Sequence, residues 1–176
     1  VFADPELTLA LPPAITAATG MDALTHNVES YLSPAYHPLC DGIALEGARI
    51  AARALPTAVA EPGNLAARGD MMMASMMGAI AFQKDLGAVH SCAHALSTVA
   101  DLHHGLANGI MIDHVMRFNL PAATAKMAEL ARVAVGQGRA RLRRLGGDAR
   151  RRLPRRGLEG LAQRRRVGRR QGRFRR

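Results

Sequence analysis

The 176-residue sequence is poor in aromatic side chains, with no Trp, two Tyr and four Phe. Because aromatic and β-branched residues are enriched in strands, their scarcity disfavours a β-sandwich. Ala, Leu and Met must then supply most of the packing, and these residues favour helices. No stretch alternates apolar and polar residues as a half-buried strand does. We therefore expect an all-α fold.

Cysteine and long apolar runs are also scarce. The two cysteines, Cys40 and Cys92, lie outside any CxxC pair, so a disulfide framework is not expected and the thiols should be reduced. No apolar run reaches the ~18–20 residues that a membrane-spanning helix needs, and no charged leader precedes an apolar segment. We expect a cytoplasmic protein with no membrane partner.

Positive charge is confined to one end of the chain. Residues 1–138 hold seven Lys or Arg and twelve Asp or Glu (7 − 12 = −5), whereas residues 139–176 hold seventeen Arg and two acidic residues (17 − 2 = +15). We therefore predict three parts: a connector over residues 1–10, an all-α metal-binding domain over 11–136, and an Arg-rich low-complexity tail over 137–176.

The Arg-rich tail has two interpretations. Clustered arginines neutralise phosphates and would suit nucleic acid, although a single aromatic residue, Phe174, offers no series of stacking platforms. Codons made only of G and C encode Arg, Gly, Ala and Pro, which are enriched here, so we prefer an out-of-frame translation of a GC-rich gene. On either interpretation the tail should be disordered, because it lacks the apolar residues of a packed core.

Proline and glycine signals divide the remaining chain into helices. The predicted helices span residues 14–32, 39–59, 65–82, 87–96, 105–118 and 121–135. The first should bury an apolar stripe formed by Ile15, Ala18, Met21, Val28 and Leu32. The third is rich in methionines that we expect to fill the core: Met71, Met72, Met73, Met76 and Met77.

Four of the seven histidines fall within fifteen residues: His90, His94, His103 and His104. His90 and His94 are four residues apart, so both project from one face of a helix. Asp22 and His26 have the same spacing far upstream. Imidazole and carboxylate donors suit a first-row divalent metal such as Zn or Fe. Each pair alone is also common as a structural or solvated pair, but together they predict one metal site.

The segments TAATGMDALTH (16–26), GAVH with AH (87–94) and HHGLANGI (103–110) resemble those of the iron-containing alcohol dehydrogenase family. The agreement in order and spacing extends from about residue 4 to residue 135. This resemblance implies a helical C-terminal domain whose metal, Fe(II) or Zn(II), is held by four ligands: Asp22, His26, His90 and His104. It also places His94 in the catalytic cleft near the nicotinamide and the substrate.

The resemblance further implies NAD(P)-linked oxidation of a small alcohol to an aldehyde or ketone, with the metal acting as a Lewis acid and a separate domain holding the nicotinamide. The sequence has no Gly-rich turn after a strand, so we assign no cofactor-binding residues and expect a fragment without the nucleotide-binding domain. Three alternatives remain open: a non-catalytic metal-binding or interaction remnant, a subunit completed by a separately encoded nucleotide domain, and nucleic-acid binding through the tail. The family also allows a homodimer.

Overall fold

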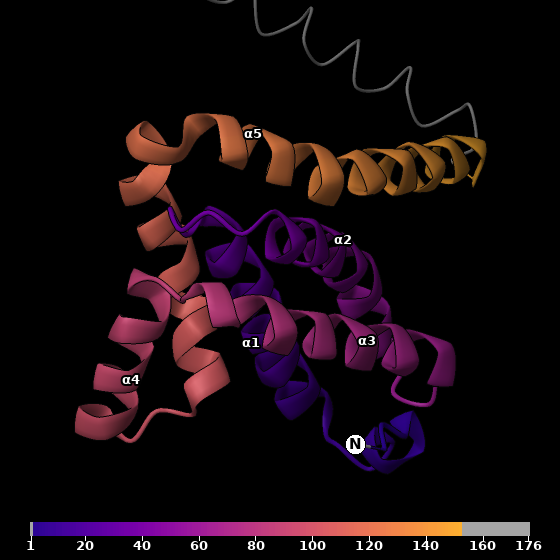
Figure 1. Ribbon diagram of the computed structural model, residues 1–176. Helices are drawn as coiled ribbons and strands as arrows, with labels where there is room; N and C mark the ends of the chain where they lie inside the picture. Colours follow the sequence, from indigo (N-terminus) through magenta and orange to yellow (C-terminus); the bar gives the residue numbers. More distant parts are fainter. Residues whose placement is uncertain (1, 153–176) are drawn as a thin grey trace, which may run out of the picture. The chain divides into compact units, whose positions relative to one another are not determined.

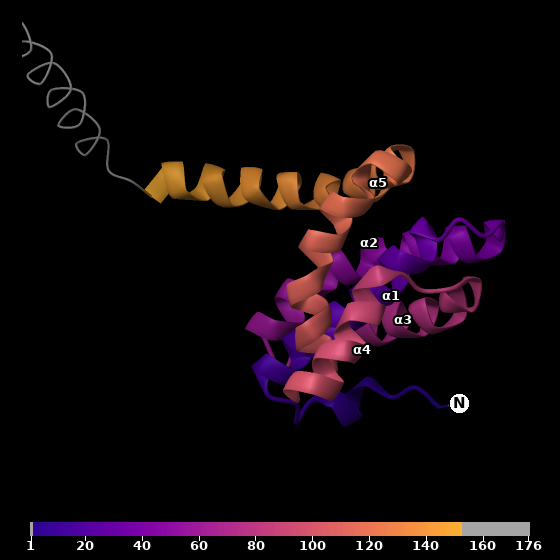
Figure 2. The same ribbon diagram turned by 90° about the vertical axis from the view of Figure 1, so that its left-hand side faces the viewer.

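The computed structural model describes the backbone of residues 2–152 and the side chains of residues 2–134. It is built from helices that are coloured along the chain in Figure 1 and seen from the side in Figure 2. The elements in chain order are the 3₁₀ helix η1 (Pro5–Thr8), α1 (Pro13–Leu32), α2 (Pro38–Ala60), α3 (Leu65–Ala81), the 3₁₀ helix η2 (Phe82–Lys84), α4 (Ala88–Ala100) and α5 (His104–Arg152). These residues include no strand, which confirms the all-α prediction.

The predicted turn signals mark the ends of the first three helices. α1 begins at Pro13, and Pro suits the first turn because its missing N–H would have no partner there. α2 follows His37, whose Nδ1 accepts a hydrogen bond from the Cys40 N–H at 3.3 Å. α3 follows Asn64, whose side chain accepts from the Ala67 N–H at 3.0 Å. These polar caps satisfy backbone donors that the helices leave free.

The last two helices are longer than predicted. α4 continues to Ala100 rather than residue 96 and ends at Asp101, whose left-handed conformation (φ 52°) is one that Asp tolerates. α5 joins the two predicted helices across a non-helical residue, Ala123. Its backbone stays helical to Arg152, beyond the predicted end of the domain at residue 136, where Ala, Leu and Arg all favour helix.

The chain divides into two units after Gly138, and the packing described below belongs to the first. The side chains of the Arg-rich tail lie outside the described residues, so frameshift and nucleic-acid binding remain predictions from the sequence. Among the described residues, no helix combines the length and apolar character needed to cross a bilayer.

α1, α2 and α3 pack closely because small residues line their interfaces. α2 and α3 run in opposite directions on either side of the short turn at residues 61–64 (Figure 1). Five alanines in these two helices are completely buried: Ala44, Ala48, Ala51, Ala74 and Ala81. The expectation that methionines form the core is wrong for Met73, which is 48 % exposed, and the other four methionines are half-buried at the flanks of α3. Alanine fills the centre because the helix backbones approach too closely for longer side chains.

The predicted apolar stripe of α1 is only half-buried, and a mostly polar set of residues faces inward instead. This buried set includes Thr16, Gly20, Ala23, Asn27 and Ser30. The Asn27 amide fits between Gly47 and Gly78, where an added Cβ would lie 2.0 Å from Oδ1 or 2.9 Å from Nδ2. Its NH₂ group donates to the carbonyls of Ala23 and Ala74 at 2.8 Å each. Hydrogen bonding therefore outweighs the apolar pattern in setting the orientation of α1.

Two lysines cover the C-terminal end of α1. The fully buried Lys84 ammonium contacts Asp41 and donates to the Tyr31 carbonyl at 3.4 Å. Lys126 donates to the same carbonyl at 2.6 Å and to Asp41 at 3.2 Å. Positive charge is favourable at a helix C-terminus, where carbonyls lack partners within the helix. Asp41 then provides the carboxylate that a buried ammonium requires.

We expect Asp41→Asn to lower the free energy of unfolding at neutral pH by about 2 kcal/mol. This figure is reduced from the loss typical of a fully buried pair, because the Asp41 side chain is 29 % exposed. Burial raises the pKa of Asp41, but the hydrogen bonds from Lys84 and Lys126 outweigh it, so the pKa lies below the usual 3.8.

Stabilisation by Asp41 should therefore be complete above pH 3.8 and be lost as the pH falls through the lower, folded-state pKa. Urea unfolding of the unmodified protein and of Asp41→Asn across this pH range measures the difference in their free energies of unfolding. Asp113→Asn is the matched control, since its exposed pair with Arg117 should contribute little. If Asp41→Asn and Asp113→Asn lowered the free energy of unfolding equally, Asp41 would not be the stabilising partner of the two lysines.

Candidate metal centre

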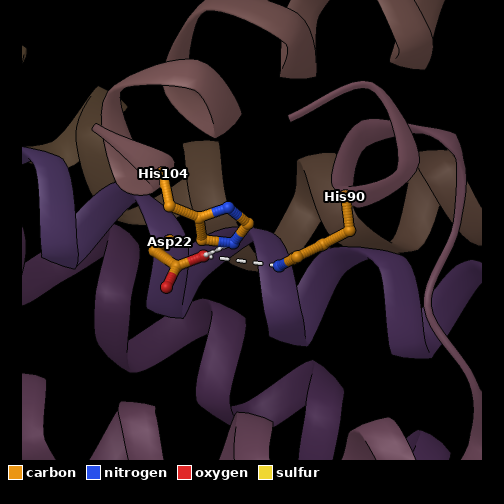
Figure 3. Close-up of side chains that lie close together, drawn as sticks. All are labelled: Asp22, His90 and His104. Atoms are coloured by element: carbon orange, nitrogen blue, oxygen red, sulfur yellow. Dashed lines mark ion pairs between the residues drawn. The ribbon is translucent and has the colours of Figure 1, made fainter. Parts of the chain in front are cut away.

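Three helices bring Asp22, His90 and His104 together, as Figure 3 shows. Asp22 lies in the middle of α1, His90 in the first turn of α4 and His104 at the start of α5. Asp22 Oδ1 is 3.3 Å from His90 Nε2 and 3.5 Å from His104 Nε2. One ligand atom from each of the three residues lies within 4.8 Å of the others. Three of the four predicted ligands therefore converge on one point.

These separations fit a common first-row metal ion. Zinc binds imidazole nitrogen and carboxylate oxygen at about 2.0–2.2 Å, so two tetrahedral ligands lie about 3.4 Å apart. The distances of 3.3 Å and 3.5 Å from Asp22 Oδ1 to the two imidazole nitrogens agree with that value. Iron accepts the same nitrogen and oxygen donors. The donor set and its spacing thus suit a divalent cation.

A fourth residue, Glu29, supports His90 from the opposite side. Its Oε2 lies 2.7 Å from His90 Nδ1, and the Glu29 side chain is only 2 % exposed. A carboxylate accepts a proton donor at Nδ1, so the lone pair of the neutral ring is left on Nε2, which faces Asp22.

Asn108 places its amide among the three predicted donors. It lies one helical turn after His104 and is completely buried. Its Nδ2 donates to Asp22 Oδ1 at 2.6 Å and lies 3.1 Å from His104 Nε2 and 3.4 Å from His90 Nε2. Its Oδ1 is buried without a hydrogen-bond partner among the described residues. The Asn108 amide nitrogen therefore lies at the point on which Asp22, His90 and His104 converge, and its one assigned hydrogen bond is to the Asp22 carboxylate.

The pKa values of Asp22, His90 and His104 show how strongly these groups interact. Burial lowers the pKa of His90, but hydrogen bonds to Asp22 and Glu29 outweigh it and raise the pKa to about 9. Burial raises the pKa of Asp22, yet the hydrogen bond from His90 and the surrounding imidazoles bring it below its usual value. For His104, burial lowers the pKa and dominates. The two carboxylates, Asp22 and Glu29, therefore stabilise positive charge on the His90 ring.

His26 and His94 border this cluster. His26 lies one turn after Asp22, and its ring stacks on that of His90 with centroids 4.5 Å apart, but its nitrogens are outside the set of converging ligand atoms. His94 is exposed, with its ring centroid 4.8 Å from that of His104 and 6.4 Å from that of His90. His103 is also exposed.

The sequence interpretation missed Glu29 and Asn108. Glu29 lies seven residues after Asp22 and three after His26, so all three share a helix face, and that spacing was a usable signal. Asn108 stands four residues after His104, the same spacing that singled out the other pairs.

Comparisons with known proteins identify related sequences over most of the chain. Residues 16–146 match the family model described as Fe-containing alcohol dehydrogenase family, C-terminal. The chain is 48 % identical over 126 residues to the 4-hydroxybutyrate dehydrogenase of Cupriavidus necator, covering 69 % of this chain and 33 % of that protein.

Two solved structures share the fold. A 1,3-propanediol oxidoreductase superposes with a TM-score of 0.73 at 45 % identity, covering 74 % of this chain and 35 % of that chain. A sulfoacetaldehyde reductase from Bifidobacterium kashiwanohense in complex with NAD⁺ gives a TM-score of 0.63 at 40 % identity, covering 66 % and 31 %.

The chain thus spans about a third of the length of the curated relatives it matches. The family model covers most of the chain, including the helices that carry Asp22, His90 and His104. The helical fold of the solved relatives extends over the same region. This protein belongs to the Fe-containing alcohol dehydrogenase family.

Proposed function

We propose that this chain binds one divalent metal ion, Fe(II) or Zn(II), and forms the metal-binding part of an NAD(P)-linked alcohol dehydrogenase. The proposed ligands are Asp22, His26, His90 and His104. The observation that carries the proposal is the convergence of Asp22 Oδ1 with the Nε2 atoms of His90 and His104. His26 stands beside them on α1, with its ring against that of His90.

Residues from three helices would form this site, and a further histidine borders it. Asp22 supplies the negative charge, and it is held in place by the Asn108 amide at 2.6 Å. His90 and His104 present imidazole nitrogens from two further helices, so little ordering is needed on binding. A bound metal ion would polarise an alcohol oxygen as a Lewis acid. The exposed His94 lies at the edge of the cluster, and we assign it contact with the substrate or relay of its hydroxyl proton.

The proposed substrates are small alcohols and the corresponding aldehydes. The substrates named for two relatives, 4-hydroxybutyrate and 1,3-propanediol, both carry a primary hydroxyl group on a short chain. NAD⁺ is bound in the solved structure of the sulfoacetaldehyde reductase, which supports a nicotinamide as the hydride acceptor. Residues that hold the nicotinamide are not assigned within this chain.

We expect the purified 176-residue protein to bind one Zn(II), or one Fe(II) under anaerobic conditions, per chain. Asp22, His90 and His104 already converge on one point, and the buried carboxylate Glu29 holds the His90 ring, so we expect a single site, with His26 as the fourth ligand. Native mass spectrometry after loading and desalting counts the retained ions. Retention of no ion by folded protein would overturn the proposal, as would several ions whose number is unchanged when Asp22 and His104 are both replaced by alanine.

A further inference from the structure

Glu29 is a buried carboxylate whose hydrogen bonds all go to the first turn of α4. Its Oε1 accepts from the Val89 N–H at 2.7 Å, and its Oε2 accepts from the His90 N–H at 3.1 Å. The same Oε2 lies 2.7 Å from His90 Nδ1. One side chain of α1 therefore holds both the backbone and the imidazole of His90.

The N-terminus of α4 leaves room for the Glu29 carboxylate. The N-cap residue is Gly87, which has no side chain with which to cap the helix. A Cβ added at Gly87 would lie 2.6 Å from Glu29 Oε1 and 3.2 Å from its carboxyl carbon. Glycine thus leaves the space that Glu29 occupies. A negative charge is favourable at this point, because the free N–H groups of a helix N-terminus face it.

We propose that Glu29 is a positioning residue of the metal site, which fixes the Nδ1–H tautomer of His90 and directs its Nε2 toward Asp22 and His104. This inference rests on the proposed metal-binding function. Histidines that bind metals commonly donate their second ring N–H to a carboxylate, which orients the ring and makes the ligand nitrogen more basic. Here the carboxylate is itself fixed by two backbone N–H groups, so the ring has little freedom to turn.

A charged carboxylate suits this task better than an amide. The Glu29 oxygens accept from three N–H groups, whereas glutamine would present an acceptor to some of them and an NH₂ group to the rest. When its NH₂ group faces Nδ1, the glutamine favours the opposite tautomer, with the proton on Nε2 and Asp22 Oδ1, 3.3 Å away, as its acceptor. That proton occupies the position where the metal should bind. A role confined to capping α4 would leave the tautomer of His90 unchanged.

Glu29→Gln therefore provides the main test. We expect the variant to bind Zn(II) about 10- to 100-fold more weakly in competition with a chromophoric chelator. In the metal-free protein at alkaline pH, where the ring is neutral, ¹H–¹⁵N correlation spectra should show His90 changing from Nδ1–H toward Nε2–H. Glu46→Gln is the matched control, because Glu46 pairs only locally with Arg49 on α2 and should alter neither measurement.

A second variant separates positioning from loss of charge or of fold. Gly87→Ala keeps the carboxylate but displaces it, and should produce the same tautomer change with a smaller loss of affinity. Circular dichroism identifies variants that do not fold. If Glu29→Gln does not fold, the Zn(II) affinity and the His90 tautomer of Gly87→Ala test the inference instead. Unchanged Zn(II) affinity with His90 still in the Nδ1–H form, in whichever of these variants folds, would refute the inference. If the unmodified protein binds no Zn(II), the proposed function fails, whereas the tautomer still reports whether Glu29 positions His90.

Discussion

Replacing His90 with alanine is expected to weaken Zn(II) binding by about 100- to 1,000-fold. Structural zinc sites with four ligands release about 10–16 kcal/mol on binding, so one ligand accounts for about 2.5–4 kcal/mol. His90 Nε2 lies 3.3 Å from Asp22 Oδ1 and is supported from behind by Glu29, so no other described side chain can replace it without moving. Competition with a chromophoric chelator measures the change.

His114→Ala is the control for this experiment. His114 is an exposed residue on α5 and lies outside the cluster of converging ligand atoms. Its loss should leave the Zn(II) affinity within experimental error. If His90→Ala and His114→Ala bind Zn(II) equally well, the metal is held elsewhere and the assignment of His90 is wrong.

Gly105→Ala should damage both the fold and the site. A Cβ at residue 105 would lie 2.2 Å from the carbonyl oxygen of Ala18 and 2.6 Å from its carbonyl carbon. Those atoms are α1 backbone and cannot turn aside, so α5 must move away from α1. We expect a loss of about 3 kcal/mol in the free energy of unfolding, at the upper end of the overpacking range. Because His104 is the adjacent residue, its Nε2 should also leave Asp22, and Zn(II) affinity should fall at least ~10-fold, as one ligand is displaced.

Gly109 offers a matched control one turn further along the same helix. An added Cβ there would meet Met21 side-chain atoms at 3.6 Å, which is ordinary contact. Alanine also favours helix over glycine by about 0.5–1 kcal/mol, so Gly109→Ala should be neutral or mildly stabilising. Urea unfolding of the two metal-free variants, Gly105→Ala and Gly109→Ala, compares their free energies of unfolding. A Gly105→Ala variant as stable as Gly109→Ala would show that the two helices are not in close contact.

The helices and most of the site residues follow from sequence patterns, because those patterns reflect local chemistry. Pro13, His37 and Asn64 act on their own helix ends, so the starts of α1, α2 and α3 were predictable. The i,i+4 spacing of Asp22 with His26 likewise depends only on helix geometry. Such features need no knowledge of the rest of the fold.

The errors concern what the helices pack against. The apolar stripe of α1 was expected to be buried, but the polar face turns inward because Asn27 fits between two glycines on other helices. The role of Glu29 depends on α4, whose first turn lies about sixty residues further along the chain. Gly105 is required only because the Ala18 carbonyl lies against it. No local pattern encodes these contacts between distant segments.

The three converging donors belong to α1, α4 and α5, which meet only when the chain is folded. An ion bound there would cross-link the three helices and would have little affinity for the unfolded chain. At a free concentration 100 times its dissociation constant, such an ion adds about 2.7 kcal/mol to stability and lowers the unfolded population about 100-fold. The supply of the metal would then govern the lifetime of the protein against proteolysis as well as its chemistry.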